Sequence, residues 1–114
     1  MVSNFEFYID ELMENIKEAD IPEYEASKIY HEIEEFVEYW KDKDYEAFDT
    51  QHDTIQTLLS GVISKATFPD GVIKALESLH TAKQTALGEV WDKGTKEAQK
   101  TEFEKMLGEQ FMIR

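Results

Sequence analysis

Apolar residues recur every three or four positions along almost the whole chain, and this spacing restricts the fold more than any other feature. Side chains at i, i+3, i+4 and i+7 share one face of an α-helix, whereas a half-buried strand alternates at every second residue. No run shows that alternation flanked by turn residues, so we expect no sheet. The first helical face consists of Phe5, Tyr8, Ile9, Leu12, Met13 and Ile16.

Four short breaks divide the pattern into five helices. The breaks lie at 20–23, 41–44, 67–71 and 94–95. We expect Asp20 to cap the second helix and Pro22 to lie in its first turn. Gly61 lies inside the third helix, where glycine costs about 1 kcal/mol relative to alanine, and we interpret it as a mark of close packing. Because short loops make sequential helices antiparallel, the sequence predicts an all-α chain, a single compact domain of about five helices over residues 1–114.

The later helices have inward faces of the same kind. These are Ile29, Ile33, Phe36, Val37 and Trp40; Phe48, Ile55, Leu58, Leu59, Val62 and Ile63; Val72, Ile73, Leu76, Leu79, Ala86, Leu87 and Val90; and Ala98, Phe103, Met106 and Leu107.

Composition excludes several classes of function. The chain has no cysteine, which excludes disulfides, thiol catalysis and cysteine-based zinc sites. A formal net charge of −13 argues against direct binding to nucleic acid or to an anionic membrane, because both would repel it. The first residues lack the basic and apolar regions of a signal peptide, and no stretch approaches the roughly 18 apolar residues of a membrane span. We therefore expect a cytoplasmic protein, in the host cytoplasm if a phage encodes it.

The net negative charge is confined to one half of the chain. Residues 1–53 contain 17 acidic and four basic residues, whereas residues 54–114 contain eight of each and are neutral. Two rows of carboxylates recur at four-residue steps within the acidic half. The first row is Glu6, Asp10, Glu14 and Glu18, and the second is Glu34, Glu38 and Asp42, with Glu35 beside it.

These rows conflict with helix stability. Like charges at i and i+4 destabilise a helix by roughly 0.2–0.5 kcal/mol per pair, so such rows indicate function. Between residues 4 and 43 the chain has 13 acidic and four basic residues. On two helices about 30 Å long this is one net charge per roughly 3.3 Å of axis, about half the density of duplex DNA. This density of negative charge favours competition with a nucleic acid for a basic groove on another protein.

In composition and architecture the chain resembles the phage-encoded DNA mimics that block restriction or CRISPR enzymes. The resemblance implies a non-enzymatic inhibitor, without cofactors, that binds a basic nuclease or effector complex. We expect the two carboxylate rows to bind this partner. Tyr39 is the expected tyrosine anchor, since tyrosine is enriched at interfaces. No serine–histidine–aspartate set, phosphate-binding loop or nucleophile elbow suggests an enzyme.

Two alternatives belong to other classes. A carboxylate–histidine metal site would use Asp49 with His52 and Glu77 with His80, because i and i+3 share one helix face, as in di-iron bundles. Carboxylates from Glu11 or Glu14 and from Glu32 or Glu35 would complete it. The other alternative is a helical adaptor or immunity-type protein whose acidic face only keeps it soluble. The apolar end at 111–114 either docks on the bundle or forms a homodimer interface.

Overall fold

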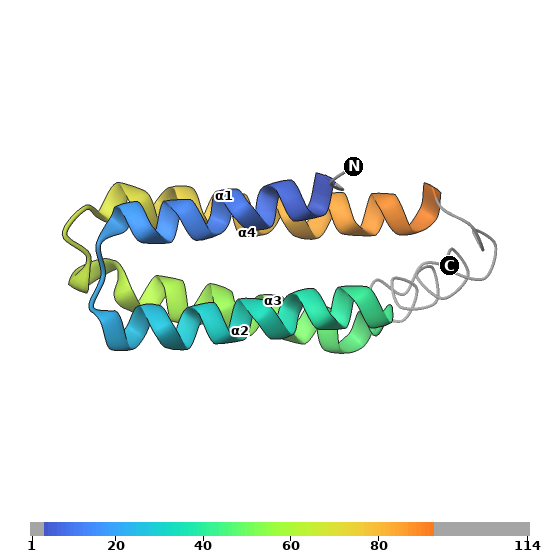
Figure 1. The fold of residues 1–114 in the computed structure, drawn as a ribbon, viewed down its shortest axis with the longest axis horizontal. Coiled ribbons are helices and arrows are strands. Elements are labelled where there is room, and N and C mark those ends of the chain that lie inside the picture. The colour runs from blue at the N-terminus through green and yellow to red at the C-terminus, as the bar shows by residue number, and fades with distance from the viewer. Residues whose placement is uncertain (1–3, 93–114) are drawn as a thin grey trace, which may run out of the picture.

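The computed structural model describes residues 4–92, which form a bundle of four α-helices. The helices are α1 (Asn4–Ala19), α2 (Glu23–Asp42), α3 (Tyr45–Val62) and α4 (Pro69–Asp92), with a short 3-10 helix, η1 (Ile63–Lys65), after α3. Each α-helix is antiparallel to the next (Figure 1). Because residues 4–92 contain no strand, the predicted all-α class is confirmed. Residues 4–92 contain four α-helices, against about five expected for the whole chain, and the expected fifth helix and the apolar C-terminal end lie outside the described residues.

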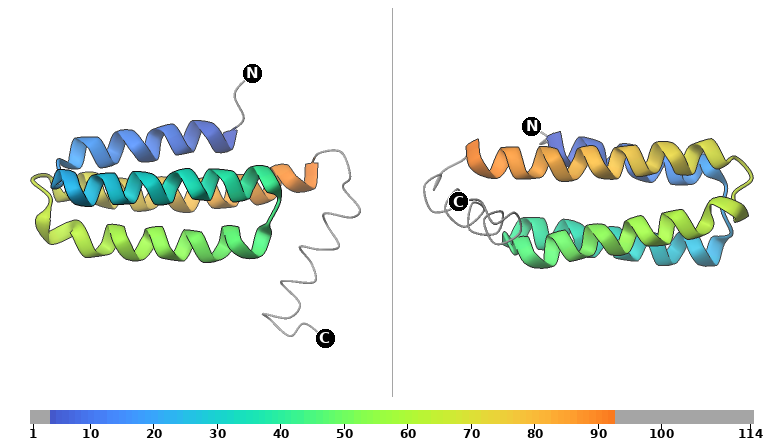
Figure 2. Two further views of the ribbon diagram at one scale, coloured as in Figure 1. Left: turned by 60° about the horizontal axis from the view of Figure 1, so that its bottom comes forward. Right: turned by 180° about the vertical axis from the view of Figure 1, so that it is seen from behind.

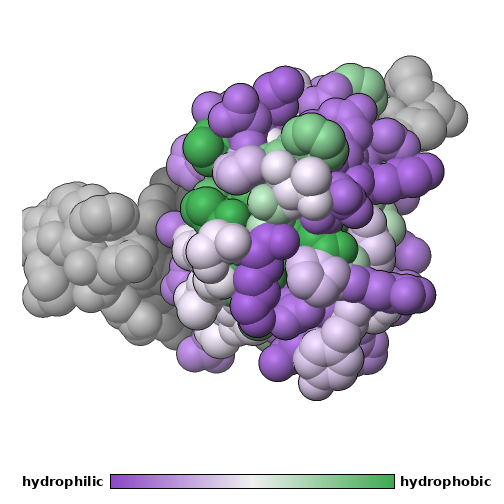
Figure 3. Space-filling view, turned by 90° about the vertical axis from the view of Figure 1, so that its left-hand side faces the viewer, coloured by the Kyte–Doolittle hydropathy of each residue, from purple (hydrophilic) through white to green (hydrophobic). Residues whose placement is uncertain are grey.

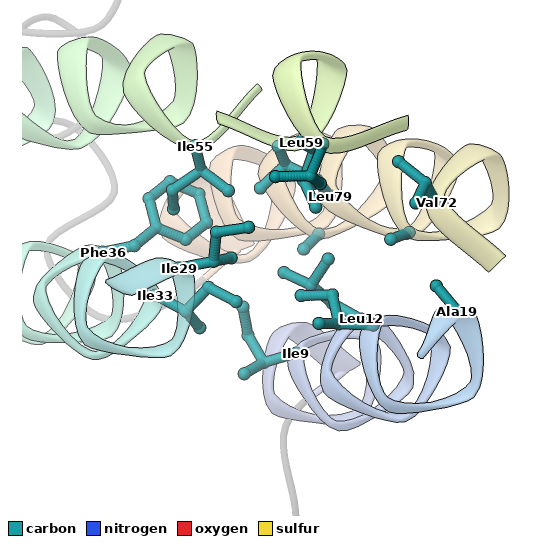
Figure 4. Packing of buried hydrophobic residues seen from close by; sticks show 14 of the residues in the cluster. Ile9, Leu12, Ala19, Ile29, Ile33, Phe36, Ile55, Leu59, Val72 and Leu79 are labelled. Atoms are coloured by element: carbon teal, nitrogen blue, oxygen red, sulfur yellow. The ribbon is translucent and has the colours of Figure 1, made fainter. Parts of the chain in front are cut away.

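The bundle has two layers, one formed by α1 with α4 and the other by α2 with α3 (Figures 1 and 2). Side chains from all four helices meet between these layers, as Figure 4 shows. The buried residues of this core are Phe5, Ile9, Leu12, Ile16, Ala19, Ile21, Ile29, Ile33, Phe36, Phe48, Ile55, Leu59, Val62, Val72, Ala75, Leu79, Ala82 and Ala86. The predicted apolar faces of the first four helices are therefore largely confirmed. Ile73 is an exception, since it is 47% exposed on α4.

The first break in the helical pattern differs from the prediction. Asp20 adopts a left-handed conformation, with φ 55°, and its backbone N–H donates to the carbonyl of Lys17 at 3.2 Å. Asp20 therefore ends α1 instead of capping α2. The residue before α2 is Pro22, which has no side-chain cap, and its carbonyl accepts from the N–H of Ala26 at 2.9 Å. Residue type does not separate these two positions, because aspartate is common both as an N-cap and in the left-handed conformation, and the N-cap prediction for Asp20 was therefore wrong.

The turn between α2 and α3 lies where the sequence predicts it. Lys43 adopts the left-handed conformation, and the N–H of Asp44 donates to the carbonyl of Tyr39 at 3.0 Å. This pattern satisfies carbonyls that the end of a helix leaves without partners. Asp44 then caps α3, since its Oδ1 accepts from the N–H of Ala47 at 3.3 Å.

Close backbone packing occurs at Gly71, and the expectation for Gly61 was wrong. A Cβ atom at Gly61 would have no contact within 4 Å. A Cβ atom at Gly71 would lie 2.7 Å from the Cα of Ala19, well inside van der Waals contact. The absence of a side chain at Gly71 therefore lets the start of α4 approach the end of α1. Periodicity identifies a glycine within a helix, but it does not show which helix passes beside it.

Further contacts hold the two ends of the bundle. At one end, the loop after η1 is bonded to the α1–α2 loop, with Thr67 N–H donating to Asp20 and Phe68 N–H donating to Ala19, at 3.1 and 3.0 Å. Figure 3 views this end, where polar side chains surround separate apolar patches. Toward the other end, aromatic rings pack together, with centroids 4.3 Å apart for Phe36 and Phe48 and 4.4 Å apart for Phe5 and Trp40.

No helix in the described part of the chain is long and apolar enough to cross a membrane.

Candidate functional site: an acidic surface on α1 and α2

The carboxylate row on α1 lies on the outer side of the bundle. Asp10, Glu14 and Glu18 are exposed and line one shallow pocket of about 390 Å³. The other residues that line it are Phe7, Glu11 and Asn15. Glu6 does not line this pocket and is half-buried. Glu6 differs from the other three members of the row because each four-residue step turns about 40° around a helix with 3.6 residues per turn. The predicted row is therefore a spiral, of which three members share a surface.

The row on α2 borders the seam between α1 and α2. Glu34 and Glu38 are exposed, Glu35 is half-buried, and all three line a groove of about 450 Å³. Asp42, near the end of the helix, is exposed and does not line the groove. The groove also contains apolar side chains, which sequence periodicity assigned only to the core.

Most of these carboxylates have no cationic partner. Among the ion pairs of residues 4–92, Glu35 lies 3.5 Å from His31 and Glu38 lies 3.8 Å from Lys41. The same part of the chain supplies no cation to Asp10, Glu14, Glu18, Glu34 or Asp42. Since both existing pairs are largely exposed, they leave the surface strongly negative.

Partly buried hydrogen bonds between helices hold the helices that bear the carboxylates. Asn15 of α1 donates to the hydroxyl of Ser78 on α4 at 3.0 Å. Gln51 of α3 donates to the backbone carbonyl and to the side chain of Glu32 on α2, at 2.9 and 2.6 Å. Glu32 is therefore bound within the bundle. The exposed carboxylates extend from backbones that are held in place on both layers.

The tyrosines occupy different environments. Tyr39 is half-buried against the core and does not line the groove, so the structure does not bring it together with the carboxylates of that seam. Tyr30 is also half-buried, and burial together with the nearby charge of Glu14 raises the pKa of its hydroxyl. Tyr24 is 76% exposed at the start of α2, whereas Tyr45 is buried. Of the four, Tyr24 has the accessibility expected of an interface anchor.

The structure does not assemble the alternative metal site. No group of three or more histidine or acidic residues with metal-binding geometry occurs in the described part of the chain. The carboxylate of Asp49 is paired with the ammonium of Lys83 on α4. His52 is buried, whereas Glu77 and His80 are exposed on α4. Spacing places two residues on one helix face, but it does not determine which way that face points.

His52 is one of three buried polar residues of the described chain, with Gln51 and Ser78, that helical periodicity did not place in the core. Its ring lies 6.4 Å from that of Phe36, and its Nδ1 lies 3.4 Å from Oδ1 of Asp53. Burial lowers the pKa of His52, and the positive charge of Lys83 adds to this, although Asp53 opposes it. The side chain is closed off from solvent, so we assign it to packing and not to substrate binding.

No protein-family model, curated protein or solved structure matches this chain. The function of the chain is therefore inferred from its own surface.

Proposed function

We propose that this protein is a non-enzymatic inhibitor that binds a nucleic-acid-binding protein, such as a nuclease or effector complex, by mimicking a nucleic acid. The observation that carries the proposal is the set of exposed, unpaired carboxylates on α1 and α2. They would occupy the positive channel in which the partner holds phosphates. This activity is that of the anti-restriction or anti-CRISPR DNA mimics, which the chain resembles in composition and helical architecture.

Electrostatics supports this partner. A basic channel that binds a polyanion gains free energy by releasing counterions, and a protein polyanion offers part of the same gain. Because the helices that bear the carboxylates are already ordered, only the side chains lose conformational freedom on binding, which favours affinity over a flexible acidic segment. The hydrogen bonds of Asn15 and Gln51 to neighbouring helices hold the backbones of α1 and α2 in register. Such a surface favours fast, salt-sensitive association with a basic partner.

The test is affinity capture from a bacterial lysate at low and at high salt, with the full chain as bait. We expect nucleic-acid-binding proteins to be enriched at low salt and lost at high salt. Recovery of no such protein under either condition would refute the proposal.

A charge-reversal series tests the assigned surface. The test variant changes Glu34, Glu35 and Glu38 to lysine, and the control changes Glu46, Asp70 and Glu77, which are exposed on α3 and α4. Both variants alter the net charge equally. We expect the first to abolish capture and the second to retain most of it. If both variants still capture the partner equally well, the adaptor alternative is favoured, in which the acidic surface only solubilises the protein.

A further inference from the structure

The seam between α1 and α2 combines an apolar floor with an acidic rim. Its floor consists of Ile9 and Met13 from α1 and Ile33 and Val37 from α2. Its rim consists of Glu34, Glu35, Glu38 and His31, all from α2. Figure 4 shows Ile9 and Ile33 lying next to each other at this seam. Both are almost fully buried, whereas Met13 and Val37 are half-buried and thus reach the surface of the groove.

The seam is open because each of its helices is held by a different neighbour. α1 packs far more closely on α4 than on α2, with Gly71 allowing the close approach to Ala19. α2 packs mainly on α3, to which Gln51 binds it. The groove of about 450 Å³ is therefore part of the architecture of the bundle.

A polyanion mimic does not need such a floor. Phosphates and carboxylates bind a basic surface through charge and charge-assisted hydrogen bonds, and the electrostatic contribution decreases with salt. Apolar side chains beside the carboxylates add a contribution that salt does not screen. A bound segment that gains both the electrostatic and the apolar contribution must present an apolar side chain between cationic side chains.

We propose that this groove binds a basic amphipathic helix of the partner protein. One apolar side chain of that helix would lie on Met13 and Val37, and flanking lysine or arginine side chains would pair with Glu34 and Glu38. Charge complementarity selects this occupant, since Glu34 has no cationic partner among the described residues and the pair of Glu38 with Lys41 is exposed. The inference rests on the proposed function and specifies the chemistry of its partner.

The direct test uses two synthetic helical peptides of about 18 residues, roughly 27 Å long. One carries a leucine stripe flanked by arginines, and the other replaces each leucine with alanine. Binding to the full chain is measured by fluorescence anisotropy at low and high salt. We expect the leucine peptide to bind about tenfold or more tightly than the alanine peptide, because each buried side chain adds apolar contact. This ratio should persist at high salt.

Variants locate the binding site. Val37→Trp fills the groove, and Leu58→Trp makes the same kind of change at a half-buried position of α3. We expect Val37→Trp to abolish the leucine preference and Leu58→Trp to retain it, with far-UV circular dichroism confirming helical folding. If Val37→Trp does not fold, Val37→Thr replaces it, since this variant keeps the shape and reduces the apolar contact; it should lower the preference severalfold.

Two results would overturn the inference: equal affinity for both peptides, or a leucine preference that the folded Val37 variant retains. Glu34→Lys separates this failure from failure of the proposed function. If that variant weakens binding of both peptides equally, the acidic surface attracts cations without the groove, and only the inference fails. If it leaves both affinities unchanged, the assignment of Glu34 to the binding surface fails as well, and the capture experiment decides the proposed function separately.

Discussion

Replacing Gly71 with alanine tests the contact that holds α1 against α4. The new Cβ would lie 2.7 Å from the Cα of Ala19 and 2.8 Å from both its N and its Cβ. Ordinary contact begins near 3.4 Å, so the backbones must separate locally by about 0.7 Å, since most of the contacted atoms belong to the main chain.

The magnitude follows from two opposing effects. Overpacking of this kind costs about 1–3 kcal/mol. Replacing glycine with alanine within a helix increases the free energy of unfolding by at most about 1 kcal/mol. With the full helix-propensity gain, we therefore expect Gly71→Ala to lower the free energy of unfolding by up to about 2 kcal/mol.

Gly61 and Gly88 provide matched controls. A Cβ atom at either position would meet nothing within 4 Å, so Gly61→Ala and Gly88→Ala should each stabilise the protein by up to about 1 kcal/mol. Urea and thermal denaturation followed by circular dichroism measure the three differences. A difference of 1 kcal/mol shifts Tm by roughly 4–8 °C in a domain of this size. The packing argument would be refuted if Gly71→Ala were as stable as the two controls.

Two other predictions concern titration and backbone conformation. Burial lowers the pKa of His52, so the unfolded chain, with a histidine pKa near 6.5, takes up a proton more readily than the folded chain. The stability of the wild type should therefore fall relative to His52→Gln as the pH decreases through about 6.5; parallel unfolding free energies from pH 7.5 to 5 would contradict this. Lys43→Gly should stabilise the protein by about 1 kcal/mol, because φ is 59° at Lys43 and glycine adopts this conformation without strain. Lys41→Gly, inside α2, should instead be destabilising, and urea denaturation of both variants would show opposite signs.

The helices could be predicted because their cause is local. The period of Phe5, Ile9, Leu12 and Ile16 places these side chains on one face whatever the neighbouring helices are. The break near Lys43 was equally clear, since charged residues replace the apolar pattern there. The end of α1 was less predictable, because the role of Asp20 depends on its left-handed backbone conformation.

The acidic surface was predictable in composition but only partly in geometry. Exposure of Asp10, Glu14, Glu18, Glu34, Glu38 and Asp42 agrees with their position opposite the apolar faces. The half-burial of Tyr39 depends on its packing against the core, and that of Glu6 on the turn of about 40° that each four-residue step makes around α1. The metal alternative failed to assemble for the same reason, since Asp49 faces Lys83 on another helix.

The sequence by itself determined that the described chain is helical, which apolar side chains form most of the core, and that most of its excess charge lies on the first two helices. These properties depend on residue type and on the fixed period of a helix. Only the tertiary structure decided which helices pack closely, why Gly71 is needed, and that α1 and α2 leave an apolar groove beneath Glu34 and Glu38. The physical reason is that the spacing between helices depends on side chains distant in sequence, which no local pattern specifies.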